Sequence, residues 1–184
     1  MTATEPFSEF FFLRCMIFSR ASEYAIQAML YLAKRTESEG KKVIQTREIA
    51  DAHSIPYHFL AKIVQDLAKA DLIMSLKGPN GGIGLAHPAS NITVLEVVRS
   101  VDNIQYVTDC VVGYDKCNAE NPCPLHHDWE KIREIIFKLI REKKLSDLVD
   151  NTEFVNGRLL RVRVPGAEPA PAAKKISKKS STKE

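Results

Sequence analysis

The chain has 184 residues, 45% hydrophobic and 27% charged, which is enough for one domain of good size or two small domains with a shared core. It has no run of about 18 apolar residues, so we expect a soluble protein without a membrane-spanning helix. The apolar patch at residues 10–13 follows two acids and precedes Arg14, the wrong charge order for a signal peptide. We therefore expect a cytoplasmic protein whose thiols stay reduced.

The formal net charge of +3 comes from the C-terminal tail. Residues 165–184 hold five lysines and two glutamates, and the rest of the chain holds 21 basic and 21 acidic residues. Nucleic-acid binding would therefore depend on a local basic surface and not on global charge. The tail is rich in Pro, Ala, Ser and Lys, a composition typical of disorder. It acts either as a solubilising tail or as an arm that contacts phosphates.

The first fifteen residues show neither a helical nor a strand period. Met16 follows them, directly before a well-patterned helix, and is an alternative start of translation. We interpret residues 1–15 as an N-terminal extension, possessing Cys15 but contributing nothing to a metal site.

Two helical patterns flank a short third one. From Ser22, apolar residues at helical spacing form two stripes, which indicate a helix buried on more than one side. Thr46 is predicted to cap a short helix over residues 47–54. After a tight turn, Pro56 suits the first position of a helix that continues to about residue 71. This arrangement of helix, turn and helix is the unit that sets its second helix into the DNA major groove.

The helix after Pro56 has one packing face and one free face. Its packing face carries apolar residues at i, i+3, i+4 and i+7, namely Leu60, Ile63, Val64 and Leu67. Its free face is predicted to hold Tyr57, His58, Ala61, Lys62 and Gln65. These are the side chains available to meet a ligand.

Residues 72–86 read as a strand, a Gly/Pro/Asn turn and a second strand. Such a hairpin stands where a winged-helix domain carries its wing, with Lys77 at the rim within reach of phosphates or the minor groove. No helix pattern opens directly after the glycines and no Gly-Lys-Ser/Thr occurs, which argues against a nucleotide-binding loop. Next, Thr93 and Glu96 predict a capping box for a short helix.

Three cysteines and two histidines gather in one short stretch, CVVGYDKCNAENPCPLHH. Cys110, Cys117 and Cys123 are separated by six and then five residues, too widely for the paired knuckles of a zinc ribbon. The spacing suits a loop that wraps one bulky inorganic cluster. Beside the helix-turn-helix pattern, the loop indicates a metal-sensing DNA-binding protein.

The stretch DWEKIREIIFKLIREKK predicts a long amphipathic helix. Trp129, Ile132, Ile136 and Leu139 alternate by three and four residues, and Ile135 and Ile140 broaden the stripe. So wide an apolar stripe favours packing against a second copy in a two-fold dimer. The alternative is a helix that only covers its own domain.

These observations predict a mainly α fold with a small β-hairpin, built as a winged helix-turn-helix DNA-binding domain plus a long dimerisation helix. We place the DNA-binding domain at residues 16–102, the cysteine loop at 103–127 and the dimerisation helix at 128–150. A C-terminal segment with the disordered Lys-rich tail occupies residues 151–184.

The residues from Met16 to about Asn151 resemble the Rrf2 family of bacterial winged-helix regulators, of the IscR and NsrR type. The resemblance is carried by SRASEYAIQAMLYLA, IPYHFLAKIVQDLAKADLI and SLKGPNGGIGLA, followed by a short helix and three cysteines. It implies a homodimer that binds palindromic operator DNA, and an iron-sulfur cluster, [2Fe-2S] or [4Fe-4S], whose presence or state changes DNA affinity.

Carried across by position, the resemblance makes Cys110, Cys117 and Cys123 the cluster cysteines. His126 occupies the place of the histidine that completes the cluster, and Glu23 the place from which other members donate a carboxylate across the dimer. The first gap of six residues is one longer than is common in the family, and both fourth-ligand candidates are present. The cluster type is therefore left open.

By the same resemblance, the recognition helix presents Tyr57, His58 and Lys62 to DNA, and the wing presents Lys77. Arg47 and Arg20, near helix starts, are candidates for phosphate contacts.

Two alternatives remain open. The three cysteines and His126 bind structural zinc, or the regulator holds no metal and responds to a protein partner or small molecule. An enzyme is not expected, because the chain has no Cys-x-x-Cys pair, nucleophile elbow or paired carboxylates near the histidines.

Overall fold

The computed structural model describes residues 17–78, 81–104, 109–150, 152–155 and 158–162. The N-terminal extension and the Lys-rich tail predicted from the sequence lie outside these residues. Within them, none of the helices is both long and apolar enough to cross a membrane.

Helix α1 (Arg20–Glu39) is the central element of the core. The Ser19 side chain caps its start by accepting from the Ser22 amide at 3.1 Å, and Gly40 ends it in the left-handed region at φ +65°. Both predicted stripes of α1 are at least partly buried, with Ala25, Ala28 and Met29 at 0% exposure. The prediction of a helix buried on more than one side is confirmed.

Helices α2 (Thr46–His53) and α3 (Tyr57–Lys69) pack on each other and on α1. Thr46 is not the cap of α2: it is the first helical residue, and Gln45 precedes it in an extended conformation without a side-chain cap. Pro56 likewise stands one residue before α3, as its N-cap. Ser54 lies between the helices at φ 55°, and its amide donates to the last turn of α2, which makes the turn short.

A polar network fixes α1 against α2. The Tyr31 hydroxyl donates to Glu48 Oε1 at 2.9 Å, and Arg35 donates to the Tyr31 oxygen from Nη2 at 2.9 Å and to Glu48 from the same nitrogen at 3.1 Å. Burial raises the pKa of Tyr31, so the hydroxyl stays a donor at neutral pH. The network therefore joins α2 to α1 by hydrogen bonds in addition to the apolar contacts of the core.

The wing is the antiparallel pair β1 (Ile73–Leu76) and β2 (Gly82–Leu85), in the register Ile73 with Leu85 and Leu76 with Gly82. Ile44 bridges to Ile83 through two backbone hydrogen bonds of 2.9 and 2.8 Å, so the wing is anchored to the segment before α2. The predicted hairpin is confirmed, although its tip at residues 79–80 lies outside the described residues.

Past the wing come η1 (Ala89–Asn91), α4 (Val94–Val101), α5 (His126–Glu142) and α6 (Leu145–Val149). The predicted capping box of α4 is present: Thr93 Oγ1 accepts from the Glu96 amide at 3.2 Å, and Glu96 accepts from the Thr93 amide at 2.7 Å. The buried side chain of Ser22 ties α1 to the end of α4 by donating to Asp102 at 3.2 Å.

The segment expected as one helix over residues 128–150 is two helices, the first starting earlier at His126. Lys143 and Lys144 are extended, because Lys143 accepts from the Val94 amide at 2.9 Å and Leu145 donates to Ile92 at 2.9 Å. Pairing with a distant strand-like segment thus interrupts the helix. A second hairpin, β3 (Thr152–Val155) and β4 (Arg158–Val162), follows α6 and was not predicted.

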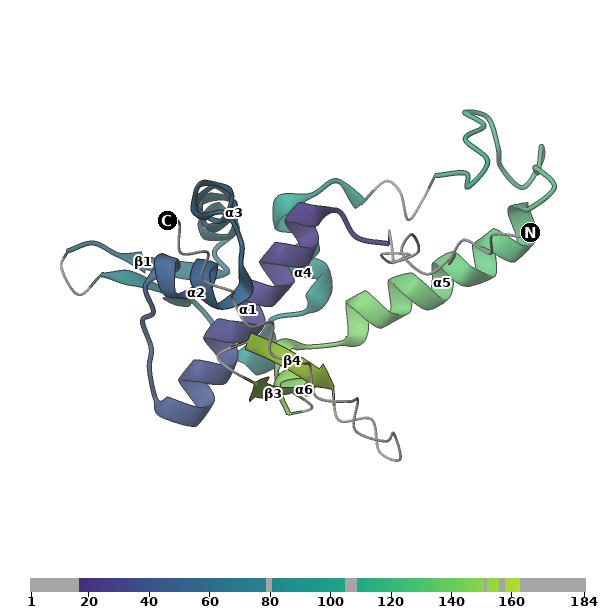
Figure 1. Ribbon diagram of the computed structural model, residues 1–184. Helices are drawn as coiled ribbons and strands as arrows, with labels where there is room; N and C mark the ends of the chain where they lie inside the picture. Colours follow the sequence, from purple (N-terminus) through teal and green to yellow (C-terminus); the bar gives the residue numbers. More distant parts are fainter. Residues whose placement is uncertain (1–16, 79–80, 105–108, 151, 156–157, 163–184) are drawn as a thin grey trace, which may run out of the picture.

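Figure 1 shows the consequence for the whole molecule: α5 extends away from the winged-helix unit, and the loop with the cysteines lies at its far end. The other end of α5 packs on α4, where Ile140 is 1% exposed and joins a small cluster with Val94, Leu95 and Val98.

Candidate DNA-binding surface and metal centre

The free face of α3 is exposed as the sequence predicted. Tyr57 is 47% exposed, and His58 and Lys62 are also exposed, one helical turn apart on the same side. On the opposite side, Leu60 and Leu67 are fully buried and hold the helix to the core. One face of α3 is therefore packed against the core, and the opposite face is exposed to solvent.

Arg47 joins this surface from α2. Its guanidinium carbon lies 4.9 Å from the centre of the Tyr57 ring, a cation-π distance that holds both side chains over the start of α3. Lys77 lies exposed on the wing. Over the described residues, no ion pair is found for Arg47, Lys62 or Lys77, which leaves three cations available for phosphates. That these residues touch DNA stays a prediction.

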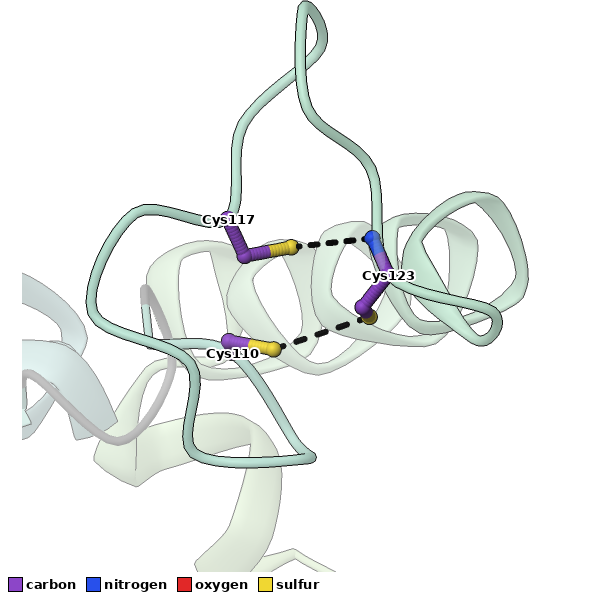
Figure 2. A group of neighbouring side chains, drawn as sticks. All are labelled: Cys110, Cys117 and Cys123. Atoms are coloured by element: carbon purple, nitrogen blue, oxygen red, sulfur yellow. Dashed lines mark hydrogen bonds between the residues drawn. The ribbon is translucent and has the colours of Figure 1, made fainter.

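The three loop cysteines point toward one another (Figure 2). The Cys110 and Cys123 sulfurs are 3.6 Å apart, and the Cys123 amide donates to the Cys117 sulfur at 3.4 Å. The three sulfurs all lie within 4.8 Å of one another. All three thiols are free, and Cys123 is buried.

His126 meets the same group from the first residue of α5. Its Nδ1 lies 3.1 Å from the Cys117 sulfur. The structure therefore groups three of the five residues predicted for the metal site, the cysteines, and places His126 beside one of them. Glu23, the fifth, lies in the first turn of α1 with its carboxylate 3.5 Å from Arg20, outside the ligand groups found among the described residues.

Local turns give the loop its shape. Gly113, at φ +81°, donates to the Cys110 carbonyl at 2.9 Å, and Cys117 donates to the Tyr114 carbonyl at 3.2 Å. The Asn118 side-chain oxygen accepts from the amides of Glu120 and Asn121 at 2.9 and 2.8 Å. Each cysteine is therefore followed or preceded by a hydrogen-bonded turn.

The thiols differ in acidity. Backbone amides, that of Tyr114 above all, lower the pKa of Cys110 to about 7. Burial raises the pKa of Cys123 above the usual value for a thiol. The Cys110 thiol is therefore more acidic than the Cys123 thiol, and the thiolate is the form of a cysteine that binds a metal.

Two features of this region were missed by the sequence reasoning. The indole N–H of Trp129 donates to the Asp109 carbonyl at 3.0 Å, although Trp129 had been assigned to the apolar stripe alone. His127 and Glu130 form a second group with His126 whose ligand atoms lie within 4.8 Å. For the second group, helical spacing was the available signal, because His127 and Glu130 are three residues apart in α5.

Comparison with known proteins covers both the exposed face of α3 and the cysteine loop. The model of the Rrf2 family, described as an iron-dependent transcriptional regulator, matches residues 18–151. The chain belongs to the Rrf2 family. It is a DNA-binding transcriptional regulator and not an enzyme, and the predicted winged-helix fold is confirmed.

Two relatives illustrate the similarity of this Rrf2 chain to other regulators. The regulator NsrR of Oceanobacillus iheyensis is 30% identical over 139 residues, which cover 75% of this chain and 92% of the relative. The regulator IscR of Klebsiella pneumoniae is 31% identical over 137 residues, covering 73% and 82%. The solved structure of CymR, the global cysteine regulator of B. subtilis, has a TM-score of 0.61 at 24% identity and covers 74% of this chain and 98% of that one. This last likeness supports the fold alone.

Proposed function

We propose that this Rrf2 regulator is a homodimer that binds operator DNA with an affinity controlled by an iron-sulfur cluster in the cysteine loop. The observation that carries the proposal is that three free thiols of one loop lie within 4.8 Å of one another, with the His126 imidazole 3.1 Å from the Cys117 sulfur. The relatives named NsrR and IscR support it as members of the same family.

The donor set suits a cluster. Thiolates are the usual ligands of iron-sulfur clusters, and a histidine replaces a cysteine in some of them. A polar cavity of about 370 Å³ opens beside Cys110 and Cys117 and leaves room on that side of the sulfurs. Cys110, Cys117 and Cys123 would hold three positions, and His126 the fourth. Such a group, when bound, supplies a centre that oxygen, nitric oxide or iron shortage can alter.

Glu23 is the alternative fourth ligand. In this chain its carboxylate pairs with Arg20 at an exposed helix start, so a role in the cluster would require a second copy to bring its α1 to the loop. Replacing His126 or Glu23 singly separates the alternatives, because only the true ligand changes the spectrum of the cluster.

The dimer would form along α5. Ile132, Ile135 and Leu139 lie on one side of the helix at i, i+3 and i+7, and they are 48%, 69% and 55% exposed. An apolar stripe so open to water favours pairing with its own copy about a two-fold axis. Pairing of α5 would also set the distance between the two recognition helices.

On DNA, we assign base reading to Tyr57, His58 and Lys62 in the major groove, and backbone contacts to Arg47 and Lys77. Coupling between metal and DNA would run through α5, since the loop lies at one end of this helix and α4 packs on the other. To shift DNA affinity, the metal has to bind one placement of the two winged-helix units more tightly than the other.

A second candidate is a structural zinc site. Two sulfurs bound at about 2.3 Å to one tetrahedral ion lie about 3.8 Å apart, close to the separation between Cys110 and Cys123. This spacing favours a single ion or two ligands on one iron over sulfurs on different corners of a large cluster.

The test is the visible spectrum of protein purified without oxygen, with iron, sulfide and zinc counted per monomer. The variants are Cys117→Ala and, as matched control, Cys15→Ala in the N-terminal extension. We expect a brown protein that loses colour and changes its operator affinity only with Cys117→Ala. A colourless protein that carries one zinc would instead support the second candidate, and operator binding unchanged in Cys117→Ala would refute metal control.

A further inference from the structure

The two ends of the cysteine loop are attached to α5 in different ways. Its last cysteine, Cys123, stands three residues before the helix, and the His126 amide donates to the Cys123 carbonyl at 3.0 Å. Its first cysteine, Cys110, is far from α5 in sequence. The hydrogen bond from Trp129 Nε1 to the Asp109 carbonyl spans twenty residues and attaches this end.

Trp129 and His126 are three residues apart and therefore lie on one side of the first turn of α5. From that turn, His126 contacts the Cys117 sulfur and Trp129 contacts the backbone beside Cys110. One helical turn thus contacts Cys117 and the residue before Cys110. Cys123 is close to the same turn in sequence. The first turn of α5 is therefore linked to the loop at or beside each of the three cysteines.

We propose that Trp129 is a positioning residue of the metal site. Its indole N–H holds the Asp109 carbonyl and keeps the Cys110 sulfur beside the other two before a metal binds. Holding the ligand in place reduces the ordering that metal binding has to impose, which raises affinity. The inference deepens the proposed function and rests on the loop being a metal site.

The structure also suggests the size of the effect. A neutral N–H···O hydrogen bond contributes a factor of about 2 to 10 to an equilibrium, and Trp129 is partly exposed, so water competes for the carbonyl. We expect the Trp129→Phe variant, which keeps an aromatic ring and loses the donor, to bind Co²⁺ about 2- to 10-fold more weakly than the wild type.

Co²⁺ is the probe because its sulfur-to-metal absorption counts the thiolates bound, whichever metal the protein holds in the cell. The matched control is Phe59→Leu, which alters a 37% exposed aromatic residue of α3, outside the cysteine loop. Trp129→Phe should lose affinity with an unchanged number of bound thiolates and unchanged helix content, and Phe59→Leu should retain wild-type affinity.

Equal Co²⁺ affinity in wild type and Trp129→Phe would overturn the proposal, and so would an equal loss in both variants. Should Trp129→Phe fail to fold, the indole N–H of the wild type provides a second measurement, since Trp129 is the one tryptophan of the chain. Its hydrogen exchange should be slower than in free tryptophan, and exchange at the free rate would refute the hydrogen bond. Absence of iron and sulfide from the wild type would defeat the proposed cluster without affecting either result.

Discussion

Replacing Ile135 by serine should separate the proposed dimer, and the exposure of this side chain gives the size of the effect. Ile135 is 69% exposed in the single chain. Fully burying an isoleucine side chain stabilises by about 1.5–3 kcal/mol, so burying the exposed part would contribute about 1–2 kcal/mol per chain. A two-fold interface contains the residue twice, which makes about 2–4 kcal/mol per dimer. The dissociation constant should therefore rise about 30- to 1000-fold.

Sedimentation equilibrium over a range of protein concentrations measures this constant directly. The matched control is Glu134→Ser, a neighbouring exposed position of α5 turned about 100° away from Ile135 around the helix. Circular dichroism checks that α5 stays helical in both variants. A wild type that is monomeric at micromolar concentration, or a constant that Ile135→Ser leaves within threefold, would refute the assignment of this stripe to the dimer.

Three further outcomes test other parts of the molecule. Lys62→Ala should weaken operator binding. A lost contact between its ammonium and a phosphate should also reduce the slope of log K against log salt by about 0.9. Fluorescence anisotropy at several salt concentrations measures both the affinity and the slope. In metal-free protein, Cys110 should be alkylated by iodoacetamide with a midpoint near pH 7, because its pKa is lowered to about 7. Cys123, whose pKa is raised, should react only at higher pH. Peptide mass spectrometry measures both reactions, and the reverse order would contradict the described hydrogen bonds. Thr93→Ala should cost about 1 kcal/mol of unfolding free energy through loss of the α4 cap, with the exposed Ser90→Ala as control, in urea titrations followed by circular dichroism.

Local patterns predicted the winged-helix unit well. The apolar spacing of α1 and α3, the glycine-rich wing and the capping box at Thr93 each involve residues within a few positions of one another, so the chain contains the whole signal. Where the prediction erred, the error was at a boundary: Thr46 begins α2 and does not cap it. A threonine before an apolar pattern satisfies both descriptions, and only backbone geometry distinguishes them.

Long-range pairing was not predictable in the same way. The break between α5 and α6 comes from hydrogen bonds of residues 143 and 145 to residues 92–94, about fifty positions away. The apolar pattern continues through residue 140 and up to Leu145, and by itself it gave no reason to stop. The β3–β4 hairpin was missed although the sequence contains a local signal for it, the Asn-Gly pair at residues 156–157 between the short runs TEFV and RLLRV.

The metal site likewise has a local part, which the sequence predicts, and a long-range part, which it does not. The available ligands could be read from the amino-acid sequence, because ligand chemistry depends on residue type and the loop is local. They are three thiols and an imidazole within seventeen residues, beside a helix-turn-helix. The tertiary structure decided how they meet. It directs His126 to Cys117, separates Glu23 from the sulfurs within one chain, and attaches the loop through Trp129 to a carbonyl twenty residues earlier. Such contacts depend on how turns and helices place distant backbone groups, and residue spacing does not encode that placement.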